Sequence, residues 1–284
     1  MKISIFTSYT NPDERMDPWK ESMACYEEYA DEVVVVGQNW PNEFSFDHIG
    51  KTFQEGFDKS KGDWVIKFDI DTMFHEKDKK KLLYFLKKYE NYPAISAPKF
   101  QIFTPERFHV KTNMTFILNK KKFPNIVLNG GGDLCDPMLD GQLLNEYNCP
   151  TVPIPFWNYD SVFKTKNVIS EDRARFARAW YAQFGNYGSR GGPTREEAFE
   201  AWFEMVKNKY KKHIYKLTIE KHPKFIKKSL LQINKSQFGY NAFGLKDTLD
   251  REIKDYISSY KDRYYGNLVR KLKYEKLDTT YTNI

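Results

Sequence analysis

The chain has 284 residues, of which 40% are hydrophobic and 17% aromatic, which is enough apolar material for one large domain or two small ones. No stretch approaches the roughly 20 consecutive apolar residues that cross a bilayer, and the first residues do not form a signal peptide, so we expect a cytoplasmic protein. Its three cysteines lack a CxxC spacing, which argues against a disulfide framework and against a zinc site.

The net charge of +7 is unevenly distributed along the chain. Residues 1–204 carry 26 Lys and Arg against 30 Asp and Glu, whereas residues 205–284 carry 19 against 8. This basic C-terminal segment could contact an anionic partner such as nucleic acid, a phospholipid surface or an acidic glycan. Equally, its lysines could simply solvate the outer faces of helices.

Strands and helices alternate over the first 70 residues. Apolar runs predict strands at 2–8, 31–37 and 63–71, and helical spacing predicts helices at 17–30 and 46–62. The four valines of the second strand favour coverage on both faces, and Gly62 is placed to end the second helix. This order is typical of a mostly parallel sheet in an α/β fold. Ligands bind such sheets beyond the carboxyl ends of the strands, so the segments "TSYTNP", "GQNWP" and "DIDTMF" are expected to meet at one site.

The pattern changes in the second half of the chain. After a helix at 76–89, further strands are expected at 94–103 and 114–119. A glycine and aspartate loop (129–141) and a proline-rich extended segment (149–160) come next. The rest is mainly helical: one helix is expected to open at Ser170 and end at Gly185, and another to open at Thr194 with Glu197 completing a capping box. We therefore expect an α/β domain over 1–165 and a helical, basic region over 166–284.

Asp69 and Asp71 form the only Asp-x-Asp in the sequence, at the end of the third strand. Two carboxylates held close together repel unless they share a cation or a proton. Their hard oxygens suit Mg²⁺ or Mn²⁺, with a diphosphate supplying further ligands. The alternative is that the two aspartates cap the following helix.

The order "SIFTSYTNP", "ADEVVVVG" and "GKTFQEGFDKSKGDWVIKFDIDTMF" resembles the nucleotide-sugar-binding half of GT-A fold glycosyltransferases, particularly those similar to family 2. The resemblance covers residues 2–80. It implies a Rossmann-like GT-A sheet in which Asp71 binds the divalent cation (Mn²⁺ or Mg²⁺) that bridges the two donor phosphates. Asp69 would hold the ribose or share the metal.

The resemblance also implies a set of donor-binding residues. Thr7, Ser8 and Tyr9 would line the nucleoside pocket, and Lys51 would pair with a phosphate or merely be solvated. Gln38, after Gly37, stands where many relatives place an acidic residue for the base or ribose, so the identity of the base stays open.

A third metal ligand is not fixed by the sequence. His75 lies four residues after Asp71 and is either that ligand or a capping residue. In relatives the third ligand commonly comes from later in the chain, where His213, His222 and Asp160 are the alternatives.

An inverting transferase needs a carboxylate that takes the proton from the acceptor hydroxyl. The loop "GGGDLCDPMLDG" offers Asp133 first, then Asp136 and Asp140, although it lacks the Glu-Asp pair that marks the base in many family 2 enzymes. A turn with solvated aspartates is the alternative.

Aromatic residues suggest a platform for the acceptor. Trp157, Tyr187 and Arg190 lie in loop-like stretches and are the candidates for contact with a sugar. Phe176, Trp180 and Phe184 have helical spacing, which favours core packing instead.

The expected function is a metal-dependent transfer of a sugar from a nucleotide-diphosphate sugar, with a UDP-sugar as the expected donor, to a hydroxyl of a glycan. Three alternatives stay open: a glycosyltransferase that modifies DNA, a nucleotidyltransferase, and a non-catalytic module that binds carbohydrate or nucleic acid. A nucleotidyltransferase would need a glycine-rich, basic loop after the first strand, and "TSYTNPDERMDP" is acidic and free of glycine.

Overall fold

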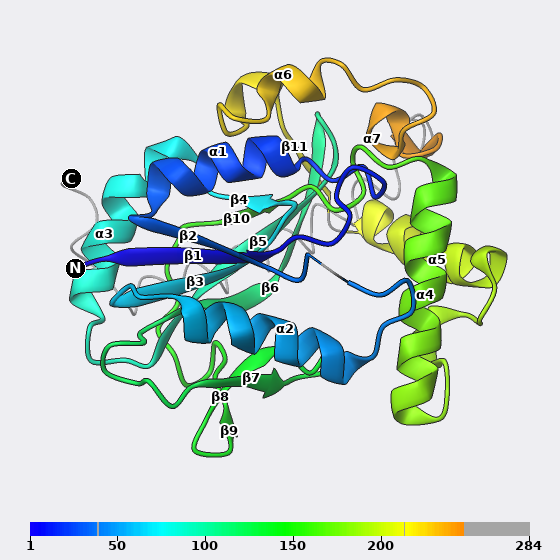
Figure 1. Ribbon diagram of the computed structural model, residues 1–284. Coiled ribbons are helices and arrows are strands. Elements are labelled where there is room, and N and C mark those ends of the chain that lie inside the picture. Colours follow the sequence, from blue (N-terminus) through cyan, green and yellow to red (C-terminus); the bar gives the residue numbers. More distant parts are fainter. Residues whose placement is uncertain (39, 213, 247–284) are drawn as a thin grey trace.

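The computed structural model describes residues 1–38, 40–212 and 214–246 (Figure 1). Its centre is a curled sheet with the strand order β2-β1-β3-β6-β5-β10-β4, to which β11 adds beside β6. The strands of this sheet are β1 (Ile3–Ser8), β2 (Glu32–Val36), β3 (Trp64–Asp69), β4 (Thr72–Met73), β5 (Ala94–Thr104), β6 (Arg107–Leu118), β10 (Phe156–Asn158) and β11 (Ile214–Lys216). A small antiparallel sheet holds β7 (Val127–Gly130), β8 (Asp136–Leu139) and β9 (Gln142–Leu143).

The pairing makes the large sheet mostly parallel. β1 is parallel to β2 and β3, and β10 is parallel to β5. β6 is antiparallel to both β3 and β5, so β5 and β10 run in the direction of β1. This mixed α/β arrangement agrees with the prediction and is compatible with a Rossmann-like GT-A fold.

Helices cover both faces of the sheet. α1 (Trp19–Tyr29) and α3 (Lys79–Lys88), which follows the 3₁₀ turn η1 (Glu76–Asp78), bury their apolar side chains on one face with Ile5, Ile66 and Phe68. α2 (Phe46–Lys59) packs on the opposite face. Burial of these apolar surfaces is the main stabilising contribution to the fold.

α4 (Lys166–Phe184) and α5 (Arg195–Lys212) lie beyond the carboxyl ends of β1 and β3 (Figure 1). Short elements complete the described chain: η2 (Gly188–Arg190), η3 (Ile219–Lys221), α6 (Lys227–Leu230) and α7 (Phe238–Asn241). None of the helices within the described ranges is both long and apolar enough to span a membrane.

Several local expectations are confirmed. Gly185 ends α4 in the left-handed conformation (φ 72°), which glycine adopts without steric cost. Thr194 and Glu197 form the predicted capping box: the Glu197 amide donates to Thr194 Oγ1 (3.2 Å), and the Thr194 amide donates to Glu197 Oε2 (3.2 Å).

Other local expectations are wrong. β2 lies at the sheet edge and four of its five residues are only half-buried, so it is not covered on both faces. α2 ends at Ser60, whose hydroxyl donates to the Gly56 carbonyl (2.7 Å), rather than at Gly62. α4 begins four residues before Ser170, where Thr165 accepts from the Val168 amide. The glycine and aspartate loop is partly strand, because β7 and β8 pair within it. The division of the chain near residue 165 stays a prediction.

Candidate active site at the carboxyl edge of the sheet

Three strand ends meet at one edge of the sheet. Ser8, the last residue of β1, pairs in register with Val36 on one side and with Asp69 on the other. The Tyr9 amide donates to the Val36 carbonyl (2.8 Å), which holds the chain after β1 against the end of β2. The first three strands therefore end side by side at one edge of the sheet, as predicted.

The residues proposed to line a nucleoside pocket differ in their surroundings. Thr7 is buried, and its hydroxyl has no hydrogen-bond partner among the described residues. Ser8 Oγ lies 3.1 Å from Thr10 Oγ1. The Tyr9 ring makes an edge contact with Trp19 (5.4 Å between centroids), whereas Gln38 is exposed. Thr7 and Ser8 are thus placed at the edge beside Asp69.

Asp69 and Asp71 lie in a turn that other elements hold in place. The Tyr26 hydroxyl, from α1, lies 2.8 Å from the Asp69 carbonyl and 2.7 Å from the Thr72 carbonyl. Asp71 is buried, and its carboxylate accepts hydrogen bonds from Asn158 Nδ2 (2.7 Å) and Thr72 Oγ1 (3.0 Å). The turn between β3 and β4 is therefore fixed by α1 and by β10.

Asp160 brings a third carboxylate to this region. Burial, and then the charges of Asp160 and Asp69, raise the pKa of Asp71 to about 7. Asp160 itself pairs with Arg173 and lies 3.5 Å from Lys164 Nζ. Against the opposing effect of burial, these two cations hold the pKa of Asp160 far below its usual range. Asp160 is thus negatively charged close to Asp71, whose raised pKa means that its charged form is disfavoured.

A buried ion-pair network continues from Asp160. Lys164 Nζ lies 2.9 Å from Asp17 Oδ1 and 3.0 Å from Asp172 Oδ2. Arg15 Nε lies 3.2 Å from Asp17 Oδ2. This network joins the segment after β1 to the first turns of α4, and it fixes the backbone around Asp160.

Lys99 is a positively charged residue that affects several of these carboxylates. It stands on β5 opposite Phe156 of β10, and its charge acts on Asp71, Asp160 and Asp136. No carboxylate among the described residues forms an ion pair with it. Lys99 is therefore available to an anionic ligand at this edge.

The three predicted base candidates have different environments. Asp133 has a side chain that is 55% exposed, and its Oδ1 lies 3.7 Å from Arg190. Asp136 is half-buried at the start of β8; burial raises its pKa, with Asp133 and Asp69 adding to the effect and Lys67 and Lys99 opposing it. Asp140 lies in the β8–β9 turn with a left-handed backbone (φ 49°). Asp136 thus lies within the field of Asp69.

Lys67 holds the loop that carries these aspartates. Its ammonium group donates to the Cys135 carbonyl (2.9 Å) and lies between the rings of Phe53 and Phe116, 4.4 Å from each centroid. Burial alone would lower its pKa, but Cys135, Asp69 and Asp136 together raise it. The charged lysine thus joins β3 to the segment between Asp133 and Asp136.

The structure does not bring the histidines to the Asp pair. His75 Nδ1 accepts from the Lys77 amide (3.2 Å) and caps η1, and burial lowers its pKa. His222 uses both ring nitrogens, with Tyr159 and with the Pro105 carbonyl. His213 lies outside the described residues. His75 thus has the capping role that was the alternative to metal ligation.

One of the three residues predicted to form an acceptor platform lies in the core. Trp157 lies in β10 and packs in the core between Phe100 and His222, so its expected loop position is wrong. Tyr187 stacks on Tyr181 (4.6 Å between centroids). Arg190 lies over the Trp180 ring (3.8 Å to the centroid). Phe176 and Trp180 pack on Phe46 of α2 beside the apolar core, as expected. Phe184 also contacts Phe46 but is exposed, so its expected core position is wrong.

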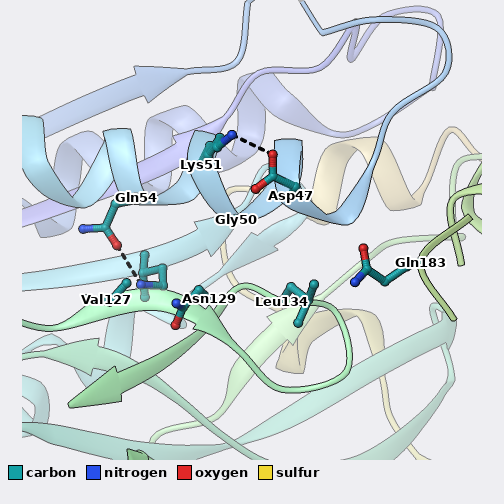
Figure 2. Close-up of a pocket in the computed structure, with 9 residues that line it drawn as sticks. Asp47, Gly50, Lys51, Gln54, Val127, Asn129, Leu134 and Gln183 are labelled. Carbon is teal, nitrogen blue, oxygen red and sulfur yellow. Dashed lines mark hydrogen bonds and ion pairs between the residues drawn. The ribbon is translucent and has the colours of Figure 1, made fainter. Parts of the chain in front are cut away.

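Lys51 lies away from this site. It pairs with Asp47 (2.7 Å) on the outer face of α2, and its side chain is 76% exposed. Both residues line a pocket of about 470 Å³ between α2 and β7, which Figure 2 shows with Gln54, Asn129 and Gln183 around it. The structure does not place Lys51 with Asp69 or Asp71.

A divalent cation fits the Asp pair only with help from a ligand. Within the described ranges, no group of three or more His, Cys, Asp or Glu is placed to hold a metal. Asp69 and Asp71 nevertheless bring two carboxylates together where a third, Asp160, adds negative charge. Mg²⁺ is commonly bound by one or two carboxylates together with substrate phosphates. The donor set thus suits a metal that arrives with a diphosphate.

Comparison with known proteins reveals only remote similarity. No protein-family model matches the chain, and no curated protein matches its sequence. Among solved structures, the chain is similar to S. aureus TarS 1-349, at 10% identity and a TM-score of 0.31, over 88% of this chain and 92% of that one. The same TarS fragment in complex with UDP-GlcNAc gives a TM-score of 0.33 at 10% identity, with the same coverage. A longer TarS chain gives 0.34 at 10% identity, over 87% of this chain and 55% of its own length. At this low level of structural similarity, we assign no function to a residue of this chain from its counterpart in TarS.

Sequence reasoning missed several residues at this site: Lys99, Asn158, Lys164 and Arg173. A signal for Lys99 was present, because a lysine inside the apolar run "AISAPKFQIF" is a charge within a buried strand. Asn158 could have been found by interpreting "PFWNYD" as a strand that ends at the same edge as "DID". Lys164 and Arg173 had no comparable signal, since their roles depend on where α4 is placed.

Proposed function

We propose that this protein is a metal-dependent glycosyltransferase that uses a nucleotide-diphosphate sugar. One observation carries the proposal: Asp69 and Asp71 stand at the carboxyl edge of a mostly parallel sheet, and the buried Asp71 carboxylate lies among like charges. A bound cation would stabilise the charged form of such a carboxylate. A UDP-sugar is the expected donor, by the resemblance of residues 2–80.

The chain's own residues have definite tasks in this proposal. Asp69 and Asp71 would hold Mn²⁺ or Mg²⁺, and the bound cation would neutralise charge on the leaving diphosphate. Thr7 and Ser8 would contact the nucleoside at the ends of β1 and β3. Lys99 would add a positive charge beside the phosphates.

Asp136 is the best of the three base candidates. The charge of Asp69 acts on it, and a carboxylate with a raised pKa takes a proton more readily than a solvated one. In a single displacement it would remove the proton of the acceptor hydroxyl as that oxygen bonds to the anomeric carbon. The carbon–oxygen bond to the diphosphate breaks, and its electron pair leaves with the nucleotide.

The alternatives account for less of the structure. A nucleotidyltransferase would need free cations after β1, but Arg15 in that segment pairs with Asp17 and Asp172. A non-catalytic module would not require the pair of Asp69 and Asp71. The DNA acceptor was suggested by the basic C-terminal segment, of which residues 247–284 lie outside the described residues. A glycan acceptor therefore stays the default.

Hydrolysis of a panel of nucleotide sugars in the presence of Mn²⁺ tests the proposal. The wild type is expected to hydrolyse one donor fastest, and Asp71→Asn, which keeps the size and the acceptor oxygen, to lose at least about 100-fold of that rate. Asp47→Asn removes an exposed carboxylate from α2 and is the matched control. Equal, slow hydrolysis of every donor by wild type and Asp71→Asn would refute the assigned site.

A further inference from the structure

Asn158 holds the side chain of Asp71 from a neighbouring strand. It stands on β10 opposite Thr72 of β4, and it is only 2% exposed. Its Nδ2 donates to Asp71 Oδ1 (2.7 Å) and to Thr72 Oγ1 (3.1 Å). The pairing of β10 with β4 therefore brings an amide donor directly to the proposed metal ligand.

Both hydrogen bonds that the Asp71 carboxylate accepts from described residues end on the same oxygen. Thr72 Oγ1 also donates to Oδ1, at 3.0 Å. A carboxylate oxygen has about two sites that accept hydrogen bonds, so Asn158 and Thr72 together fill those of Oδ1. Among the residues that the structure describes, none donates to Oδ2 or forms an ion pair with it. The protein thus occupies one oxygen of Asp71, and the other is available to a ligand.

The backbone of this turn is held by other groups. The Tyr26 hydroxyl lies within hydrogen-bond distance of two carbonyls of the turn, and the Tyr159 amide donates to the Asp71 carbonyl (2.9 Å). These contacts involve neither the Asn158 side chain nor the Asp71 carboxylate. The side-chain amide of Asn158 is therefore not needed to form the turn, and what it fixes is the orientation of the carboxylate.

The number of oxygens that a carboxylate offers affects which cation it binds. Ca²⁺ takes about 6–8 oxygen ligands and accepts both oxygens of one carboxylate, whereas Mg²⁺ and Mn²⁺ favour an octahedron of single oxygens. Residues that orient a metal ligand also matter for affinity, and loss of one commonly costs about 10–100-fold. A carboxylate that the protein holds by one oxygen is suited to the smaller cations.

We infer that Asn158 is a positioning residue for the cation: with Thr72 it occupies Oδ1, so that Asp71 binds through Oδ2 alone and the site prefers Mn²⁺ or Mg²⁺ to Ca²⁺. The inference rests on the proposed function, because it takes Asp71 as a ligand of the cation that accompanies the diphosphate. It goes beyond that proposal in assigning the coordinating atom and the basis of metal selectivity. The side chain of Asn158 acts through Asp71 and is not itself a ligand.

Asn158→Ala tests this inference. Electron paramagnetic resonance of free Mn²⁺ gives the Kd of Mn²⁺ in the presence of UDP, and displacement by Ca²⁺ gives that of Ca²⁺. We expect the variant to bind Mn²⁺ about tenfold or more weakly than the wild type does. Because the released Oδ1 can then join Oδ2 on the larger ion, the preference for Mn²⁺ over Ca²⁺ should fall by about threefold or more. Neither value depends on sugar transfer.

Asn119→Ala is the matched control. Asn119 is also a buried asparagine (3% exposed), and its Nδ2 donates to the carbonyls of Glu90 (2.8 Å) and Tyr92 (3.1 Å). It follows β6 beside the amino ends of β3 and β5, at the opposite edge of the sheet. This variant should lose a comparable buried contact and keep both the affinity for Mn²⁺ and the preference over Ca²⁺.

The hydroxyl of Thr72 gives a second pair of variants, which decides the question if Asn158→Ala does not fold. Thr72→Val keeps the shape of the side chain but removes the donor to Oδ1, so it should weaken Mn²⁺ binding and lower the preference over Ca²⁺, each by about threefold or more. Thr72→Ser keeps the hydroxyl and should stay within about twofold of the wild type.

Equal Mn²⁺ affinity in the wild type and Asn158→Ala would overturn the inference, and so would an equal loss of affinity for both cations. Equal binding by Thr72→Val and Thr72→Ser would overturn it as well. In each of these cases the wild type still binds Mn²⁺ with UDP, so the proposed function stands. A wild type that binds no Mn²⁺ in the presence of UDP would overturn the proposed function and this inference together.

Discussion

Asp71 illustrates how a single residue is changed by its surroundings. In sequence it is one aspartate of a short motif, and its distance from Asp69 alone fits a helix cap as well as a metal site. In the structure its carboxylate is buried, accepts from Asn158 and Thr72, and lies within the field of Asp160. Asn158 and Asp160 are far from the motif in sequence, so no local pattern could have indicated their interactions with Asp71.

A second prediction at the residue scale concerns His222 and the pH dependence of stability. The Pro105 carbonyl can only accept, so Nε2 donates to it (2.8 Å) and Nδ1 accepts from the Tyr159 hydroxyl (2.9 Å). This arrangement needs a neutral ring, and burial lowers the pKa of His222 to about 4. Between its ordinary pKa of about 6.5 and this value the unfolded chain binds more protons than the folded one. The free energy of unfolding is therefore expected to fall as pH drops through this window, by at most about 1.4 kcal/mol per pH unit.

Urea denaturation at pH 7, 6, 5 and 4 measures this effect, with His222→Gln as the comparison. The glutamine variant does not gain a charge, so its curve should fall less steeply than that of the wild type between pH 6.5 and 4. Parallel curves would show that protonation of His222 does not contribute.

At the scale of elements, α2 supports the loop that carries Asp133 and Asp136. A β-carbon on Gly50 would lie 2.5 Å from the Leu134 carbonyl oxygen, so the loop rests directly on the helix backbone at this point. Gln54 strengthens the contact by accepting from the Leu128 amide (2.7 Å). Figure 2 shows Gly50, Gln54 and Leu134 together at this junction.

Gly50→Ala is expected to displace this loop and to lower sugar transfer by about tenfold or more, because a shift of a catalytic group by about 1 Å is that costly. Binding of UDP should change little, since the donor residues lie at β1 and β3. Lys51→Ala changes the neighbouring, exposed residue and should keep full transfer. Normal transfer by Gly50→Ala would show that the loop does not carry the base.

At the scale of the whole molecule, the buried ion pairs join distant parts of the chain. Lys164 contacts Asp17, Asp160 and Asp172, so it connects the segment after β1 with β10 and α4. Its removal takes one cation away from three closely placed carboxylates and leaves only arginines to compensate their charge. Lys164→Met is therefore expected to lower the free energy of unfolding by about 3–5 kcal/mol, measured by urea denaturation. Lys51→Met, which breaks an exposed pair, should cost less than about 1 kcal/mol, and a similar cost for both would contradict this account.

The sequence predicted the sheet better than it predicted the site. Apolar runs and helical spacing place β1, β3 and α2 within a few residues of their observed bounds, because these segments bury one continuous apolar surface. The error at β2 arose because four valines look alike at the edge and at the centre of a sheet. The site depends on residues such as Lys99 and Arg173, whose partners lie far away in sequence and are brought together only by the packing of β5, β10 and α4.

The central claim is that Asp69 and Asp71 hold a divalent cation together with a nucleotide diphosphate. Isothermal titration of UDP into the protein, with Mn²⁺ and then with a chelator, tests it most directly. We predict at least about tenfold tighter binding with Mn²⁺ for the wild type and for Asp47→Asn, and loss of that difference in Asp71→Asn. UDP binding of equal strength with and without Mn²⁺, or none at all, would contradict the claim.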